Sequence, residues 1–180
     1  MRLLEHRRHS HRSPGGLHLS PTGVALARRV GSGSPGFDRV VTSPRPRAVE
    51  TAEAMGFRVD SELEGLGSVP DAVSDRLAEA SRSSFAGFVD IVELGGIVGR
   101  FANDQAALWA GEVERLRDGG RLLLVSHGHL IELGTAAALP AAARSWGSLL
   151  GYLEGVRLFR EGGRWVGGEV LRIDPAWTRA

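Results

Sequence analysis

Histidine and arginine side chains that could carry out phosphoryl chemistry follow three predicted strands. The three clusters are Arg8-His9-Ser10, then Thr42-Ser43-Pro44 with Arg47 one helical turn further on, and Ser126-His127-Gly128. Arginine presents forked N–H donors that match phosphate oxygens, and histidine can act as a nucleophile that forms a covalent intermediate. If these clusters meet in the folded chain, they favour phosphoryl chemistry that needs no metal ion.

The elements around these clusters predict how they meet. Strand patterns alternate with helix patterns, and the apolar run Leu122-Leu123-Leu124-Val125 is typical of a central strand buried on both faces. Strands are expected at 2–6, 37–42, 57–63 and 122–125, and helices at 20–30, 46–55, 98–117 and 130–138. This order predicts an α/β fold, a three-layer αβα sandwich with a mostly parallel central sheet. Ligands bind at the carboxyl ends of the strands in such sheets, so the clusters share one rim.

Capping and turn residues indicate where several of these helices and strands begin or end. Ser20-Pro21 predicts an N-cap with proline at the first helical position, and Gly31 is expected to end that helix. Gly162-Gly163 predicts the turn of a hairpin between strands at 152–159 and 165–173. The stretch from about 64 to 96 carries little strand signal, and we expect a small helical cap there, inserted into a single domain that spans residues 1–180.

Composition excludes several classes of protein. The chain has 180 residues, 22 arginines, no lysine, no cysteine, 21 acidic residues and a formal charge of +1. Disulfides and cysteine-based zinc sites are therefore excluded, and the charge balance argues against a nucleic-acid partner or a polybasic membrane anchor. No segment reaches the roughly 18 apolar residues of a membrane span, and the first residues lack the apolar stretch of a signal peptide. We expect a cytoplasmic protein without a membrane partner.

Four motifs in order resemble those of the histidine phosphatase superfamily, which includes cofactor-dependent phosphoglycerate mutases. Arg8-His9-Ser10 resembles the Arg-His-Gly signature, and Val125-Ser126-His127-Gly128 is similar to the late Val-Ser-His-Gly motif. The segment from Ser43 to Ala52 resembles Ser-Pro-x-x-Arg-Ala-x-x-Thr-Ala, and Leu19-Ser20-Pro21-Thr22-Gly23 resembles the opening of the family's first helix. Order and spacing agree over about residues 2–135, in the pattern of the short branch.

The resemblance implies a role for each matched residue. His9 is the implied nucleophile, which takes the phosphoryl group, while Arg8 and Arg47 bind its oxygens and His127 completes the pocket as a donor. The two arginines favour neutral His9, because a nearby like charge lowers the pKa of a histidine. No cofactor and no metal are implied.

Three departures from the family pattern concern the segment around the nucleophile. Ser10 stands where glycine is usual, and it either adds a hydroxyl donor to the substrate or crowds the site. Residues 8–14 also resemble the Arg-His-Gly-x-Arg-x-Pro of the larger histidine acid phosphatases, so Arg12 is a candidate third phosphate contact; the alternative is a surface charge. Gly15 stands where the mutases carry an asparagine, which weakens the mutase interpretation.

The general acid is less clearly marked. The family places a carboxylate after its third strand, and Ser61-Glu62-Leu63-Glu64-Gly65 offers two candidates. We favour Glu64 as the catalytic acid, because it lies further beyond the strand, and keep Glu62 as the alternative. Some short members of the family lack such an acid and act on leaving groups that need little protonation, such as phosphohistidine.

The resulting prediction is a metal-independent phosphatase that hydrolyses a phosphomonoester, either a small molecule or a phosphoprotein, through a phosphohistidine at His9. A phosphoglycerate-type mutase and a non-catalytic relative that binds a phosphorylated ligand are the alternatives. His6, His11 and His18 cluster near His9 in sequence and raise the alternative of a metal site, but their spacing fits no common zinc pattern.

Overall fold

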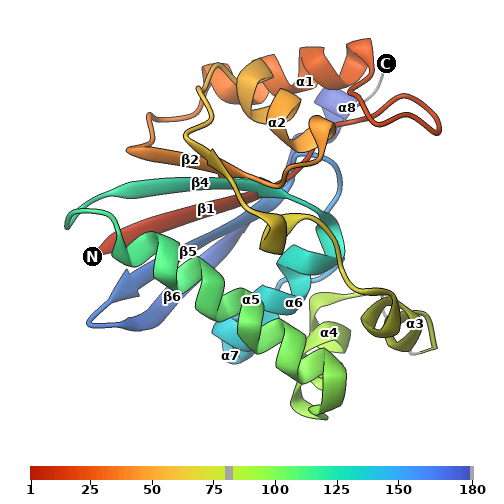
Figure 1. Cartoon of the computed structure of the whole chain (residues 1–180), viewed down its shortest axis with the longest axis vertical. Coiled ribbons are helices and arrows are strands. Elements are labelled where there is room, and N and C mark those ends of the chain that lie inside the picture. Colours follow the sequence, from red (N-terminus) through yellow and green to blue (C-terminus); the bar gives the residue numbers. More distant parts are fainter. Residues whose placement is uncertain (80–82, 179–180) are drawn as a thin grey trace.

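A six-stranded sheet forms the centre of the computed structural model, which describes residues 1–79 and 83–178 (Figure 1). The strands are β1 (Arg2–Arg8), β2 (Arg39–Thr42), β3 (Ser61–Glu62), β4 (Arg121–Ser126), β5 (Gly155–Glu161) and β6 (Arg164–Leu171). Their order is β3-β2-β4-β1-β5-β6; β3, β2, β4 and β1 run parallel, and β5 pairs antiparallel with both β1 and β6. The predicted mostly parallel sheet is confirmed.

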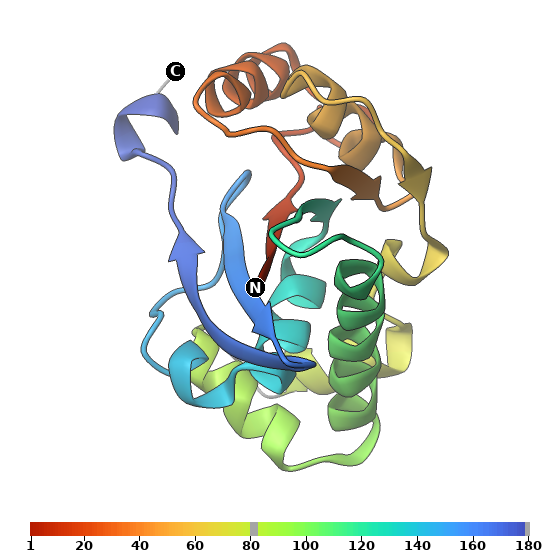
Figure 2. The same ribbon diagram turned by 90° about the vertical axis from the view of Figure 1, so that its left-hand side faces the viewer.

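Helices cover both faces of this sheet, and the layers are seen from another side in Figure 2. One face carries α1 (Pro21–Ser32), α2 (Pro46–Ala54) and the short α8 (Pro175–Thr178). The other carries α5 (Gly96–Glu114) and α6 (Gly128–Ala138), with α4 (Phe85–Glu93) and α7 (Pro140–Ala143) beyond them. The 3₁₀ helix η1 (Glu64–Leu66) and α3 (Asp71–Glu79) complete the described elements. The α/β class is therefore as predicted.

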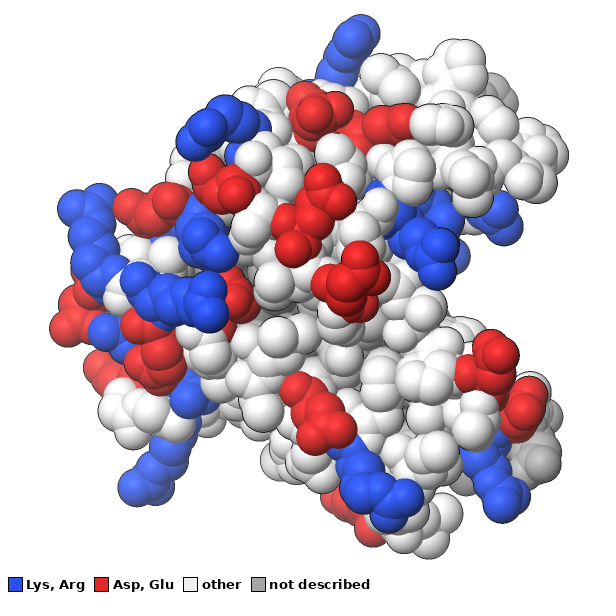
Figure 3. Space-filling view, viewed as in Figure 1, with Lys and Arg blue, Asp and Glu red and all other residues white. Residues whose placement is uncertain are grey.

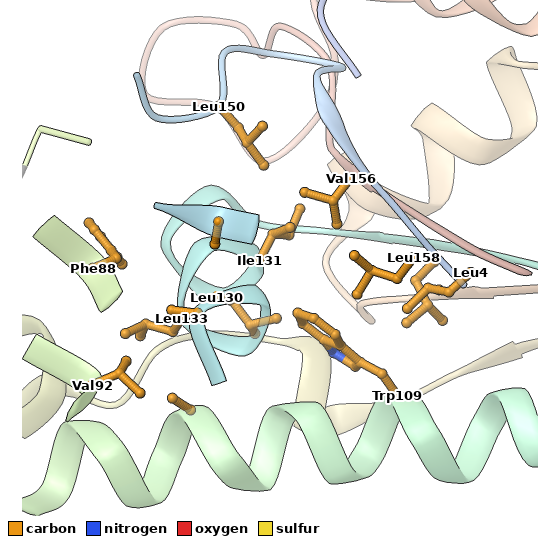
Figure 4. Packing of buried hydrophobic residues seen from close by; sticks show 14 of the residues in the cluster. Leu4, Phe88, Val92, Trp109, Leu130, Ile131, Leu133, Leu150, Val156 and Leu158 are labelled. Carbon is orange, nitrogen blue, oxygen red and sulfur yellow. The ribbon is translucent and has the colours of Figure 1, made fainter. Parts of the chain in front are cut away.

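Each face of the sheet buries its own apolar cluster. The larger cluster lies under α5 and α6, where Trp109 is fully buried with Leu130 and Leu133 (Figure 4). The smaller one joins α1 and α2 to the sheet through Leu26, Ala48 and other small or branched side chains. Burying one large apolar side chain contributes about 1.5–3 kcal/mol, so these two clusters hold the strands whose ends carry the polar residues.

Helix α1 begins as predicted but ends later. The Ser20 hydroxyl accepts a hydrogen bond from the N–H of Gly23 at 3.1 Å, and Pro21 occupies the first turn. The prediction that Gly31 ends the helix is wrong, because α1 continues to Ser32. A Cβ on Gly31 would lie 2.0 Å from the carbonyl oxygen of Met55, so this glycine serves the close approach between α1 and the end of α2.

The segment from 64 to 96 is helical in its described part, as predicted. Here α3 and α4 follow η1, and Phe85, Phe88 and Val89 of α4 are buried in the larger apolar cluster. Helix α4 packs on α5, α6 and α7. None of the described helices is both long and apolar enough to cross a membrane.

Candidate active site

The three predicted clusters meet at the carboxyl ends of β1, β2 and β4, around a cavity of about 410 Å³. In the space-filling view this side of the molecule is hollowed, and basic side chains gather along the upper edge of the hollow (Figure 3). Besides glycines, the cavity is lined by Arg8, His9, Arg12, Arg47, Ser68, Val69, Ser74, His127, His129 and Tyr152. Four predicted site residues from three separate motifs, namely Arg8, His9, Arg47 and His127, therefore line one cavity.

His9 is fixed at the end of β1 with one ring nitrogen unprotonated. Its backbone N–H donates to the carbonyl of Ser126 at 2.9 Å, which continues the pairing of β1 with β4. Its Nδ1 lies 2.7 Å from the carbonyl oxygen of Ser10. A carbonyl only accepts, so Nδ1 carries the proton and Nε2 keeps its lone pair. A neutral imidazole in this tautomer is a nucleophile.

The surroundings of His9 keep it neutral. The side chain is almost wholly buried, and burial is the main reason that its pKa falls to about 4. The hydrogen bond to Ser10 opposes this change, while the charges of Arg47, Arg8 and Arg12 add to it. Desolvation and nearby cations both disfavour the imidazolium.

Arg47 joins the two site histidines. From the first turn of α2 its Nε donates to His9 Nε2 at 3.1 Å and its Nη2 donates to His127 Nδ1 at 3.3 Å. His127 Nδ1 must then accept, so its proton is on Nε2, which donates to the Ser43 hydroxyl oxygen at 2.9 Å. Burial, followed by the charge of Arg47, lowers the pKa of His127 to about 3. In this arrangement His127 presents an acceptor toward Arg47, whereas the sequence predicted a donor toward phosphate.

Arg8 and Arg12 add two further cations to the cavity. Arg8 Nη1 donates to the carbonyl of Leu150 at 2.6 Å, and its guanidinium carbon lies 4.5 Å from the centre of the Tyr152 ring. Arg12 is exposed and donates to the carbonyl of Gly16 at 3.3 Å. Three guanidinium groups beside a neutral histidine form a site for an anion with several oxygens.

Comparison with known proteins identifies the family of the chain. The family model of the histidine phosphatase superfamily (branch 1) matches residues 4–166. The chain belongs to this superfamily. No curated protein sequence matches the chain.

Solved structures share the fold of this chain. A phosphoserine phosphatase of Entamoeba histolytica, in complex with 3-phosphoglyceric acid, has a TM-score of 0.72 at 19% identity, over 96% of this chain and 98% of that one. A phosphoglycerate mutase of Bacillus anthracis str. Sterne has a TM-score of 0.65 at 18% identity, over 91% and 90%. A mycobacterial glucosyl-3-phosphoglycerate phosphatase has a TM-score of 0.63 at 22% identity, over 95% and 98%.

The second sequence motif also holds the loop after β1 in place. The Thr51 hydroxyl oxygen accepts from the N–H of Ser10 at 3.0 Å, and the same hydroxyl donates to the carbonyl of Arg47. Glu50 accepts from the N–H of Leu19 at 2.7 Å and pairs with His18. Helix α2 therefore holds both the start and the end of the loop after β1.

Ser10 does not occupy the position that the sequence suggested. Its side chain is fully buried, and its hydroxyl donates to the carbonyl of Gly23 at 2.7 Å. Ser10 is not among the residues that line the cavity. In this structure the hydroxyl donates its hydrogen bond to α1, and a contact between Ser10 and a substrate stays a prediction.

The two candidate acids lie outside the walls of the cavity. Glu62 ends β3 and Glu64 begins η1, and both side chains are exposed. Of the described residues that line the cavity, none is an aspartate or glutamate. The choice of Glu64 as the catalytic acid stays a prediction.

Sequence reasoning missed Tyr152, which lies in the loop before β5. From the sequence, only residues that follow parallel strands are expected at this rim. Because β5 runs antiparallel to β1, with Gly155 opposite Arg7, the loop that precedes β5 lies at the same rim as the residues that follow β1. His129, next to the late motif, and Ser68, Val69 and Ser74, from the predicted cap, were also missed.

The three histidines that raised the metal alternative do not converge. His6 is fully buried, 2.6 Å from the Ser126 hydroxyl and edge-on to Trp109. His11 contacts the Tyr152 ring, and His18 pairs with Glu50. Within the described residues, no group of three or more His, Asp or Glu side chains is placed to hold a metal ion.

Proposed function

We propose that this chain is a metal-independent phosphatase that hydrolyses a phosphomonoester through a phosphohistidine at His9. The observation that carries the proposal is the hydrogen bond from His9 Nδ1 to the Ser10 carbonyl. It leaves Nε2 unprotonated, and the lone pair on Nε2 is what attacks phosphorus. Nε2 attacks phosphorus as the bond to the leaving group breaks, and water then hydrolyses the N–P bond.

The arginines take part in both steps. Arg47 is in contact with His9 Nε2, so it can bind an oxygen of the phosphoryl group as that group arrives. Arg8 and Arg12 supply further charge for the oxygens, which carry the negative charge of the transition state. When Arg47 turns to phosphate, His127 loses that donor, and a shift of its single proton from Nε2 to Nδ1 would make neutral His127 the predicted phosphate donor.

The segment from 64 to 96 is proposed to select the substrate. Ser68, Val69 and Ser74 come from it and form the wall of the cavity that carries no arginine. A small polar or weakly apolar leaving group fits such a wall. Phosphomonoesters of small molecules and of proteins are both candidate substrates. We place the protein in the cytoplasm.

The decisive experiment is turnover of para-nitrophenyl phosphate in the presence of a chelator. We expect activity in wild-type protein, loss by at least about 1000-fold in His9→Ala, and trapping of a phosphohistidine that this variant cannot form. His18→Ala is the matched control, since this exposed histidine lies outside the cavity and should leave activity intact. Full activity of His9→Ala would remove the proposal.

A mutase is the second candidate, favoured by the structural likeness to a phosphoglycerate mutase. It is distinguished by its product: phosphoryl transfer between two positions of a sugar acid, with no release of inorganic phosphate. Binding of phosphorylated ligands with no turnover of any ester would instead indicate a non-catalytic relative.

A further inference from the structure

The proposed reaction needs a proton for its leaving group. The alcohol portion of an alkyl phosphomonoester leaves as an alkoxide unless a donor protonates its oxygen. Such a donor contributes about 10²–10⁴-fold in rate. The described residues that line the cavity include no carboxyl group, and Glu62 and Glu64 are exposed outside it. Among the described residues that line the cavity, the possible donors are therefore hydroxyl groups and imidazoles.

Most of these groups are poor donors for this step. The proton of His127 is held by Ser43, and burial lowers the pKa of His129, so both imidazoles are neutral near pH 7. Ser68 and Ser74 carry aliphatic hydroxyls, whose conjugate bases are about as strong as the alkoxide they would protonate. A phenol is a far stronger acid than an alcohol, which leaves Tyr152.

Tyr152 is the only tyrosine in the chain and is held firmly at the cavity wall. The Arg8 guanidinium carbon lies 4.5 Å from the ring centre, and the His11 ring centre lies 4.3 Å away. The ring of the nucleophile His9 is 5.6 Å from it. The adjoining backbone is fixed too, because the N–H of Leu150 donates to buried Glu132 at 2.8 Å.

We propose that Tyr152 donates the proton to the leaving-group oxygen, an inference that rests on the proposed phosphatase function. As Nε2 of His9 forms its bond to phosphorus and the P–O bond to the leaving group breaks, the phenol O–H gives its proton to that oxygen. The product alcohol leaves, and a tyrosinate remains, with the Arg8 guanidinium over its ring.

The second half of the reaction restores the tyrosine. Water attacks phosphorus, its proton passes to the tyrosinate, and the N–P bond breaks to give inorganic phosphate and neutral His9. One residue thus acts as acid in the first step and as base in the second, and no proton is left over. Arg8 couples the two roles, since it faces both the Tyr152 ring and the cavity that takes the phosphoryl group.

The experiment uses Tyr152→Phe, which keeps the ring and its packing and removes only the hydroxyl. kcat/KM is measured for para-nitrophenyl, phenyl and benzyl phosphate, whose leaving groups need increasing protonation. We expect a loss of about 100-fold for benzyl phosphate, a smaller loss for phenyl phosphate, and less than about 3-fold for para-nitrophenyl phosphate. The small effect on the last ester also shows that the variant is folded.

Two variants make the result specific. Glu64→Gln is the matched test of the rival acid, and His9→Ala reports on the proposed function itself. An equal loss for all three esters in Tyr152→Phe, or a dependence on the leaving group that appears in Glu64→Gln instead, overturns the assignment of Tyr152 while leaving a His9-dependent phosphatase. Activity that survives in His9→Ala, or no turnover of any ester by wild-type protein, rejects the proposed function and this inference with it.

Discussion

At the scale of single residues, the site depends on histidines that stay uncharged among arginines. Burial is the main cause of the lowered pKa of His9, and the charges of the adjacent guanidinium groups lower that pKa further. None of the three cavity arginines makes an ion pair with a carboxylate in the part of the chain that is described, so their charge is not cancelled locally. The cavity is therefore cationic, while His9, the proposed nucleophile, remains neutral.

The charge state of His9 gives a prediction on pH. Its pKa of about 4 lies below the ordinary 6.5, so the nucleophilic neutral form is present above about pH 4 and is lost as the pH falls through that value. An NMR titration of the His9 ring should have its midpoint near 4, and Arg47→Ala should raise it. The fall of kcat/KM at low pH, which reports on the free enzyme, should therefore not set in at pH 6.5 because of His9. A midpoint near 6.5 in wild-type protein would contradict this account.

Side-chain direction is what the sequence could not supply at this scale. Residue type and motif order predicted that Arg8, His9, Arg47 and His127 share a site, and they do line one cavity. Ser10 was expected to face the substrate, but α1 offers its hydroxyl the Gly23 carbonyl. Which way a short side chain turns depends on acceptors that only the packed helix brings close.

At the scale of elements, the strands and helices of the parallel part were predictable because their patterns are local. β3 is shorter than expected, with only Ser61–Glu62 paired, although residues 57–63 read as a strand. Asp60 explains the late start, since its carboxylate accepts from the N–H of Val40 at 2.9 Å and occupies the position before the ladder. Tyr152 was missed because the antiparallel direction of β5 is not visible in a local pattern.

The packing of α5 against α6 gives a prediction on stability. Gly134 of α6 faces Trp109, and a Cβ there would lie 2.1 Å from the buried indole ring. Gly134→Ala should lower the free energy of unfolding by about 1–3 kcal/mol, because the ring must move in a filled core. Denaturant unfolding followed by circular dichroism measures this.

Gly111→Ala is the control within the same helix pair. Gly111 lies inside α5, is exposed, and has no atom within 4 Å of a built Cβ. This variant should raise stability by up to about 1 kcal/mol, because alanine has the higher helix propensity. Equal destabilisation by both substitutions would show that the Trp109 contact is not the cause.

At the scale of the whole molecule, buried histidines and a buried glutamate change the stability of the fold with pH in opposite directions. His6, His9 and His127 have pKa values lowered to about 3, 4 and 3, chiefly by burial. Burial also raises the pKa of Glu132 to about 7. The histidines contribute stability that is full above pH 6.5 and is lost as the pH falls. Glu132 contributes in the opposite direction, since its protonated form is favoured in the folded chain below pH 7.

This opposition predicts how one substitution changes the acid response of the fold. Between pH 7 and about 5, folded Glu132 holds a proton that the unfolded chain has released, so it offsets the uptake of one proton by an unfolded histidine. Glu132→Gln keeps an oxygen for the N–H of Leu150 but cannot titrate. Its free energy of unfolding should therefore fall about 1.4 kcal/mol more per pH unit than that of wild-type protein between pH 6 and 5. Urea unfolding at closely spaced pH values measures both slopes, and parallel slopes would mean that Glu132 is ionised in the folded chain.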